Sequence, residues 1–215
     1  MLNPTSYALG SNRSCIRELF EYGRSRAAIV GAENVYDYSL GNPSIPAPKE
    51  VDDAIRAVLQ DTDSLQVHGY TSAVGDLATR QAIADDLNAR YNAGVKPENL
   101  FLGCGAAPEL VAVFRALAVP GAEILAIAPY FPEYKPFVEG TGAAFKVVAP
   151  DVPDFQIKLE AVEAMLTPNT AAIIVNSPNN PSGVVYTQET LEALGTLLTR
   201  KSEEYGHPIY IVADE

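Results

Sequence analysis

Residues 173–183 read Ile-Ile-Val-Asn-Ser-Pro-Asn-Asn-Pro-Ser-Gly, and this stretch decides the fold. An apolar run from Ala171 to Val175 stops abruptly at polar residues and prolines. Such a run is typical of a strand with both faces buried, as in a parallel sheet. The two prolines exclude a helix and favour a rigid turn. Open α/β sheets bind ligands just beyond the carboxyl ends of their strands, so the turn would present Asn180 to a ligand. Alternatively, it is an ordinary turn whose asparagines bond only their own backbone.

Apolar strands alternate with amphipathic helices through the rest of the chain, which is typical of βαβ units around a mainly parallel sheet. We therefore expect an α/β fold with three α/β/α layers and a mostly parallel mixed sheet. Strands are predicted at residues 100–102, 123–128, 143–148, 171–175 and 209–213. Helices are predicted at residues 13–29, 49–60, 74–93, 108–119 and 187–205. Two further helices are predicted, one that ends at about residue 139 and one around residues 159–166, and a loop is predicted at residues 65–72. Two helices have predicted inward faces, made of Val51, Ile55, Val58 and Leu59 in one and of Leu77, Ile83, Leu87 and Tyr91 in the other.

Composition and charge exclude several classes of protein. Hydrophobic residues make up 47% of the chain and charged residues 20%, as in ordinary soluble proteins. The net charge of −12 argues against nucleic acid or an anionic membrane as the main partner. Two cysteines and two histidines, far apart, argue against a disulfide or a metal site. No signal peptide and no apolar run of about 20 residues is visible, so we expect a cytoplasmic protein.

Three more strand ends carry groups suited to a ligand. Gly105, Ala106 and Ala107 lie between a predicted strand and a helix start, where backbone N–H groups favour a phosphate, although any tight turn there needs small residues. Tyr130 and Phe131 follow the next strand at a proline turn, and an aromatic ring held there could stack on a flat ring or could simply pack in the core. Asp214 ends an apolar strand and needs a partner, which could be a cation, a metal, a protonated ring nitrogen, a helix N-terminus or an arginine.

Together these strand ends would offer a phosphate cradle, a flat surface, an amide and an anion at one edge of a sheet. A phosphorylated aromatic heterocycle with a basic ring nitrogen matches all four features. Pyridoxal 5'-phosphate is such a molecule. A mononucleotide is the main competitor, but it does not need an anion directed at a ring nitrogen.

The motifs also occur in a recognisable order. They are Ser39-Leu40-Gly41-Asn42-Pro43, Tyr70 with Gly75 to Arg80, Gly105-Ala106-Ala107, Pro129-Tyr130-Phe131 with Tyr134, Asn179 to Gly183, and Ala213-Asp214-Glu215. In this order the chain resembles the N-terminal half of fold-type I pyridoxal-phosphate aminotransferases, the class I/II group that includes aspartate aminotransferases. The set covers nearly the whole chain.

The resemblance implies a role for each matching residue. The backbone of Gly105, Ala106 and Ala107 would hold the cofactor phosphate, and Tyr70 would reach the phosphate in the neighbouring subunit of a homodimer. Three residues would bind the cofactor ring: Phe131 would stack on it, Asn180 would bond its phenolic oxygen, and Asp214 would pair with its nitrogen. On the substrate side, Tyr134 would line the site, Asn180 would also contact the substrate, and Gly41 would meet the substrate carboxylate.

The resemblance also implies that the chain is the front half of a longer protein. Residues 1–47 would be the N-terminal segment of a small domain with its hinge, and residues 48–215 a cofactor-binding large domain, incomplete at its C-terminal end. The family's Schiff-base lysine would lie beyond Glu215, so no catalytic residue is expected in this chain, and the 215 residues alone would be inactive.

The function implied is transfer of an amino group from an L-amino acid to a 2-oxo acid. Three alternatives stay open from the sequence. The same cradle could serve a carbon–sulfur lyase. The scaffold could be a non-catalytic cofactor-binding module. It could also be a nucleotide-binding α/β domain.

Overall fold

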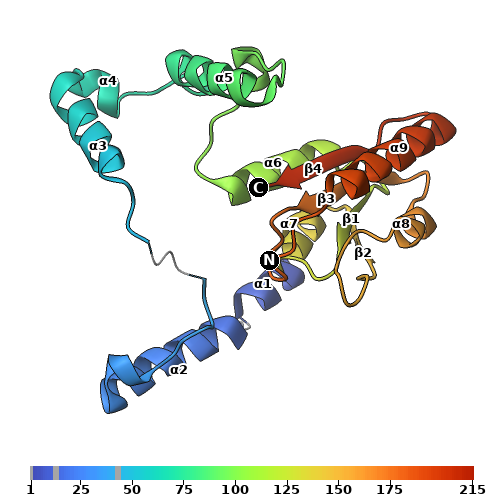
Figure 1. The fold of residues 1–215 in the computed structure, drawn as a ribbon, viewed down its shortest axis with the longest axis horizontal. Helices are drawn as coiled ribbons and strands as arrows, with labels where there is room; N and C mark the ends of the chain where they lie inside the picture. The colour runs from blue at the N-terminus through green and yellow to red at the C-terminus, as the bar shows by residue number, and fades with distance from the viewer. Residues whose placement is uncertain (1, 12–14, 42–44) are drawn as a thin grey trace. The chain divides into compact units, whose positions relative to one another are not determined.

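The computed structural model describes residues 2–11, 15–41 and 45–215, which form two compact units (Figure 1). One unit comprises residues 1–73 and the other residues 74–215. We describe each unit by itself. The domain boundary predicted at residues 47 and 48 concerns the intact protein and stays a prediction.

The larger unit is built on a four-stranded parallel sheet with the strand order β2-β1-β3-β4. The order differs from the chain order because β3 crosses over to pair with β1. The sheet is α/β in class, as predicted, and all four of its strands are parallel. The strands are β1 (Glu123–Ile127), β2 (Ala144–Val148), β3 (Thr170–Asn176) and β4 (Tyr210–Asp214), each within about one residue of its predicted position.

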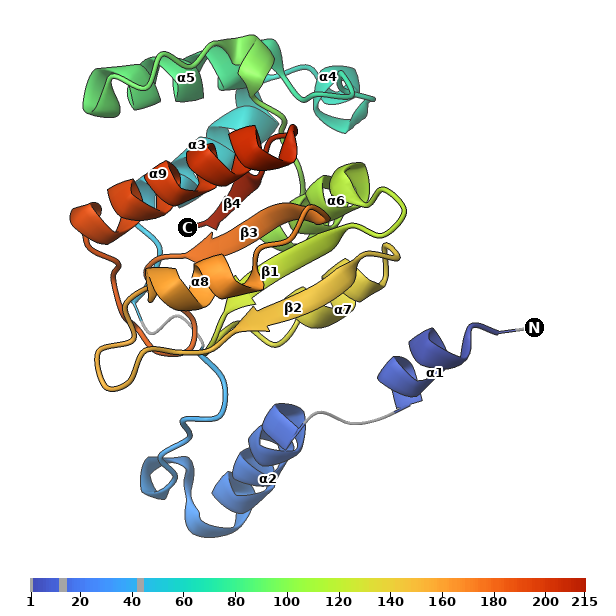
Figure 2. The ribbon, with the colours of Figure 1, turned by 90° about the vertical axis from the view of Figure 1, so that its right-hand side faces the viewer.

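Helices cover both faces of this sheet, so the predicted three-layer arrangement is confirmed. On one face, α6 (Ala106–Leu117) and α7 (Tyr134–Glu139) pack against the sheet. On the other face lie α8 (Leu159–Met165) and α9 (Gln188–Tyr205). Figure 2 shows α8 and α9 in front of the sheet with α6 and α7 behind it.

Strands β1 and β3 are buried on both faces because apolar side chains alternate between the two helical layers. In β1, Leu125 and Ile127 face the layer of α8 and α9, whereas Ile124 and Ala126 face the layer of α6 and α7. In β3, Ile173 and Val175 face the first layer, and Ala172 and Ile174 face the second. The continuous apolar run that opens the sequence analysis thus forms the strand it predicted.

The strand predicted at residues 100–102 is wrong. These residues follow the short helix η2 (Pro97–Asn99) and are extended, but they belong to no strand. Leu102 makes one backbone bond, from its N–H to the carbonyl of Val74, at 3.2 Å. An extended segment becomes a strand only beside a partner strand, and none of the described strands pairs with this one.

Helix α5 (Leu77–Tyr91) is shorter than predicted because polar residues stop it at both ends. The Asp76 carboxylate caps the first turn by accepting from the N–H of Thr79 at 2.8 Å. Asn92, in the left-handed conformation, ends the helix before Gly94.

The predicted inward face of α5 is wrong. The helix buries Arg80 and Ala84, whereas Leu77, Ile83 and Tyr91 are exposed. The Arg80 guanidinium donates to the carbonyl of Pro97 at 2.7 Å, which fixes the helix to the segment that follows it. The buried face of α5 thus contains the polar side chain of Arg80, although the periodicity predicted only apolar side chains there.

The smaller unit consists of helices that bury none of their described side chains. Its helices are α1 (Pro4–Ser11), α2 (Cys15–Val30), η1 (Ala32–Asn34), α3 (Lys49–Asp61) and α4 (Ser64–His68). The helices predicted at 13–29 and 49–60 are present, but Arg13 and Ser14 lie outside the described residues. The inward face predicted for α3 is 46–60% exposed, because none of the described elements of this unit covers it. Part of the loop predicted at residues 65–72 is the helix α4, which Asp63 caps.

Candidate functional site

The carboxyl ends of β1, β3 and β4 bring the predicted residues Tyr134 and Asp214 together with Asn176, which was not predicted. Tyr134 begins the helix after β1, Asn176 ends β3, and Asp214 ends β4. Asn176 and Asp214 are paired in the sheet register, so the two strands end side by side. The turn with Asn180 follows directly from β3. This edge is where an open α/β sheet is expected to bind its ligand.

Tyr134 is the partner that Asp214 requires. The Tyr134 hydroxyl donates a hydrogen bond to the Asp214 carboxylate across the end of the sheet. Tyr134 is only 1% exposed, and Asp214 is half-buried. Burial, followed by the bond to Asp214 and its negative charge, raises the pKa of the Tyr134 hydroxyl well above its ordinary value. The tyrosine therefore stays protonated and holds one carboxylate oxygen in place.

At alkaline pH the free energy of unfolding is expected to fall less steeply with pH when Tyr134 is replaced by phenylalanine. A group whose pKa is raised on folding stabilises the protein fully below its unfolded pKa, about 10 for tyrosine, and this contribution falls as pH rises towards the folded value. Above about pH 10, each such tyrosine makes the free energy of unfolding fall by about 1.4 kcal/mol more for each pH unit. Denaturant unfolding of the intact protein between pH 9 and pH 11 measures this slope.

Tyr186 is the matched comparison for this measurement. Burial also raises the pKa of its hydroxyl, so Tyr186→Phe should flatten the same slope. Only Tyr134→Phe removes a bond to Asp214. A Tyr134→Phe slope equal to that of the wild type would contradict the assignment of a protonated tyrosine beside Asp214.

Asn176 links Asp214 to the turn that carries Asn180. Its side-chain N–H donates to the backbone carbonyl of Asp214 at 2.7 Å. Its side-chain oxygen accepts from the backbone N–H of Asn180 at 2.6 Å. The sequence analysis gave Asn176 no role. The available signal was a lone amide as the last residue of an otherwise apolar strand.

The two asparagines of the turn differ in what their side chains do. Asn179 is 6% exposed, and its side-chain oxygen accepts from the N–H and the hydroxyl of Ser182 at 3.2 and 2.8 Å. The ordinary-turn interpretation therefore describes Asn179. Asn180 is exposed, and its side chain bonds to none of the described residues. An ordered turn thus presents one amide that is free to bind a ligand.

Phe131 packs beside Tyr134 at the same edge. The two rings meet edge to face, with centroids 5.5 Å apart and planes at 80°. Phe131 is partly buried and packs against the core under α6 and α7. It therefore has a core contact on one side and some exposed surface, and the stacking role stays a prediction.

Helix α6 begins at Ala106, two residues before the predicted start at Pro108, so Gly105 is its N-cap and Ala106 and Ala107 are its first residues. Gly105 precedes the first turn with a φ of +110°, a conformation that favours glycine, and a Cβ there would meet nothing within 4 Å. Ala106 lines a pocket of about 390 Å³ together with Asp214. The free N–H groups and the positive end of the helix favour an anion there, although Glu109 and Glu215 also line the pocket.

Two predicted residues lie in the smaller unit and are not placed relative to this edge. Tyr70 is fully exposed, and its ring packs against no described residue of its own unit. Gly41 is exposed, and a Cβ there would meet nothing within 4 Å. Their roles towards a phosphate and a substrate carboxylate stay predictions.

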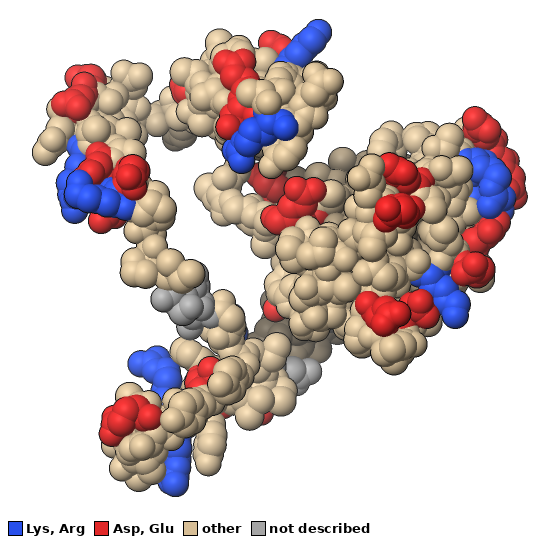
Figure 3. Space-filling model, viewed as in Figure 1, with Lys and Arg blue, Asp and Glu red and all other residues tan. Residues whose placement is uncertain are grey.

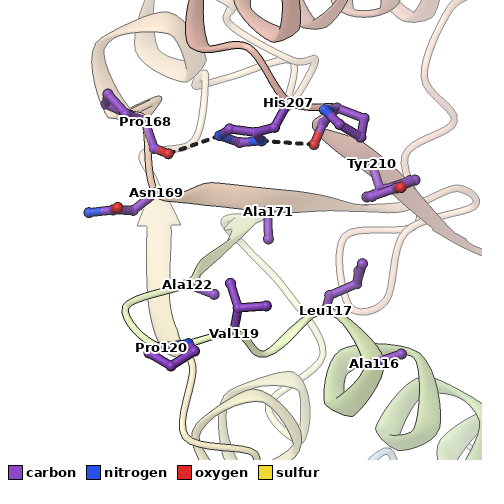
Figure 4. A pocket seen from close by; sticks show the side chains of 11 residues that line it. Ala116, Leu117, Val119, Pro120, Ala122, Pro168, Asn169, Ala171, His207 and Tyr210 are labelled. Atoms are coloured by element: carbon purple, nitrogen blue, oxygen red, sulfur yellow. Dashed lines mark hydrogen bonds between the residues drawn. The ribbon is translucent and has the colours of Figure 1, made fainter.

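A second pocket, of about 320 Å³, lies at the opposite, amino ends of the strands (Figure 4). Apolar side chains and prolines line most of it. His207 lies between two backbone carbonyls, with Nε2 2.9 Å from that of Pro168 and Nδ1 3.1 Å from that of Pro208. The ring thus connects the loops before β3 and β4, and none of the predicted site residues lines this pocket.

The described residues give no sign of a metal centre or a membrane span. No three histidine, cysteine, aspartate or glutamate side chains among them gather as metal ligands do. No helix in the described ranges is both long and apolar enough to cross a membrane. On the face drawn in Figure 3, basic side chains lie in small groups among acidic ones.

The chain belongs to the aminotransferase class I and II family, whose sequence profile matches residues 32–214. It is 33% identical to the aspartate aminotransferase of Thermotoga maritima over 89% of this chain and 48% of that protein. It is 32% identical to the aspartate/prephenate aminotransferase of Thermus thermophilus over 82% of this chain and 44% of that protein.

A solved structure, an amino transferase from Eubacterium rectale, shares 53% identity and a TM-score of 0.97 over 100% of this chain and 54% of its own. The chain spans about half the length of the curated relatives it matches. The resemblance inferred from the ordered motifs is thereby confirmed, and class I and II aminotransferases depend on pyridoxal phosphate.

Proposed function

We propose that the intact protein is a pyridoxal-phosphate-dependent aminotransferase that moves an amino group from an L-amino acid to a 2-oxo acid. One observation carries the proposal. Asp214, fixed by the buried hydroxyl of Tyr134, lines the same pocket as Ala106 at the start of α6. A carboxylate and a helix N-terminus in one pocket support the proposal, because a phosphorylated pyridine needs an anion for its ring nitrogen and N–H groups for its phosphate.

The residues present fit this cofactor. Backbone N–H groups of Gly105, Ala106 and Ala107 would hold the phosphate, and no atom lies within 4 Å of the Cβ position at Gly105. The ring would lie against Phe131, with Asn180 bonded to its phenolic oxygen and Asp214 to its nitrogen. When bound, pyridoxal phosphate supplies an electron sink for the substrate's α-carbon.

The chain's own residues hold and orient the reacting groups. Asp214 would keep the ring nitrogen protonated, because an ionised carboxylate at bonding distance favours the charged form of its partner. Tyr134 would prevent the carboxylate from rotating away. Asn180 would supply an uncommitted amide, and its exposed side chain is also available to a substrate.

The smaller unit and the partners enter the proposal as follows. Gly41 belongs to the segment of residues 1–47, which would close on the substrate. Its backbone would then meet the substrate carboxylate. Tyr134 was also predicted to line the substrate side. Tyr70 of the partner subunit would contact the phosphate in a cytoplasmic homodimer. The lysine that binds the cofactor covalently would lie beyond residue 215. The relatives' names mention aspartate and prephenate, and we propose for this protein the broader class of amino and 2-oxo acids.

Borohydride reduction of the intact protein tests the proposal. The protein should absorb visible light as purified, gain the mass of one phosphopyridoxyl group per chain on reduction, and transfer an amino group to a 2-oxo acid. Protein that binds no pyridoxal phosphate after reconstitution would overturn the proposal. Release of a thiol from a sulfur amino acid, without transfer to an acceptor, would instead identify a carbon–sulfur lyase.

A further inference from the structure

We propose that Asn176 is a positioning residue that sets the separation between Asn180 and Asp214. The inference rests on the proposed function, because it concerns the two residues expected to bind opposite sides of the cofactor ring. It adds a residue that neither the motif order nor the function assigns.

The position of Asn176 in the sheet gives the first part of the argument. It is the last residue of β3, and its register partner is Asp214, the last residue of β4. This is the last register pair that the two strands form, and β3 continues from it into the turn at Ser177 and Pro178. The end of a sheet is the point where adjacent strands can move apart most easily, because no further ladder bond holds them.

The bonding of the side chain gives the second part. Its amide donates to the Asp214 carbonyl at 2.7 Å and accepts from the Asn180 N–H at 2.6 Å. Both ends of one planar group are therefore committed, one to the strand that carries the acid and one to the turn that carries the free amide. A single rigid group thus sets how far apart those two backbones lie.

An amide is the group that this position requires. Aspartate would keep the acceptor for the Asn180 N–H, but it would place a second oxygen against the Asp214 carbonyl, where no proton can be shared. Leucine has a similar shape and could form neither bond. Alanine would leave two backbone groups without their partners.

The separation matters because the ring is rigid. Asn180 and Asp214 can both bond it only if their spacing matches the distance between its phenolic oxygen and its nitrogen. A displacement of about 1 Å at a site of this kind can cost a large factor in binding or rate. Asn176 would act through these neighbours and would not touch the ring itself.

The test compares Asn176→Ala with Asn88→Ala in the intact protein. Asn88 is a matched control because its side chain also bonds two backbone groups, the carbonyl and the N–H of Val95 at 2.7 and 2.8 Å. It lies in α5, and its side chain bonds to none of the predicted site residues of the larger unit. The readouts are the dissociation constant of pyridoxal phosphate and the pH midpoint of the bound cofactor's visible absorption, with thermal unfolding recorded for both variants.

We expect Asn176→Ala to weaken cofactor binding about tenfold and to raise the absorption midpoint, because a misplaced Asn180 no longer stabilises the ionised phenolic oxygen. Asn88→Ala should change neither readout, even where its loss of thermal stability is equal. If Asn176→Ala is too unstable to study, Asn176→Asp, which keeps one bond, should show the same two changes.

Two failures can be told apart. If the wild type binds pyridoxal phosphate but the Asn176 variants match Asn88→Ala in affinity and absorption midpoint, the positioning role is refuted and the proposed function stands. If the wild type binds no pyridoxal phosphate, the proposed function fails and this inference fails with it.

Discussion

Asp214→Ala in the intact protein should lower turnover by about a thousandfold while the protein stays folded. The variant removes the only carboxylate assigned to the ring nitrogen, so the ring would lose its proton and much of its capacity to accept electrons. A thousandfold effect corresponds to about 4 kcal/mol of transition-state stabilisation. The buried Tyr134 hydroxyl would lose its acceptor, which costs about 1–3 kcal/mol of stability and leaves a typical protein folded.

Glu204→Ala is the control for this prediction. Glu204 is also a carboxylate with a fixed partner, Lys201 at 2.8 Å, but it lies on the exposed side of α9. Its removal should leave turnover unchanged. Steady-state kinetics with saturating cofactor measure both variants, and an Asp214→Ala turnover within threefold or so of the wild type would refute the assignment of Asp214.

Phe114→Ala should have the largest effect on stability, lowering the free energy of unfolding by about 3–5 kcal/mol. Phe114 is 0% exposed in the core between α6 and the sheet, among Ile124, Ile174 and Val138. Truncation would leave a cavity under the helix whose first residues form the predicted phosphate cradle. Cofactor affinity should therefore fall together with stability.

Phe101→Ala separates the effect of burial from the effect of losing a ring. Phe101 is 60% exposed, so its truncation creates no cavity and should change stability by less than about 1 kcal/mol. Denaturant unfolding of both variants gives the comparison. Equal losses for the two would mean that α6 is not anchored to the sheet by Phe114.

The sheet was predictable because its signals are local. Runs such as residues 171–175 are apolar at every position, and turn residues mark where they stop. Parallel strands covered by helices need that pattern, whatever the rest of the chain does. The order of the strands was not predicted, since it depends on which apolar runs pair after the chain has crossed the sheet.

The helix faces and the strand at residues 100–102 could not be predicted by the same signals. Periodicity shows which side of a helix is apolar, but not whether anything covers it. The apolar side of α3 is exposed in its own unit, and in α5 the inward positions belong to Arg80 and Ala84. An extended segment likewise needs a neighbour, which no local pattern can supply.

For the candidate site, the sequence predicted the position of polar groups but not their partners. It placed Asn180 and Asp214 at strand ends, and the register of β3 and β4 brings those ends together. The bond between Tyr134 and Asp214 joins residues 80 positions apart, so no spacing rule could reveal it. Asn176 was missed because its two bonds depend on the same register.

The double-sided burial of β1 and β3 separates the parts of the chain that can change from those that cannot. The apolar positions at 124–127 and 172–175 tolerate best side chains of about the same size, since they pack against the helical layers. The residues just past the strand ends are the ones predicted to bind the ligand, and they differ in burial: Asn180 is exposed, whereas Tyr134 is part of the core. A substitution at an exposed position such as Asn180 is therefore expected to leave the sheet and its core intact.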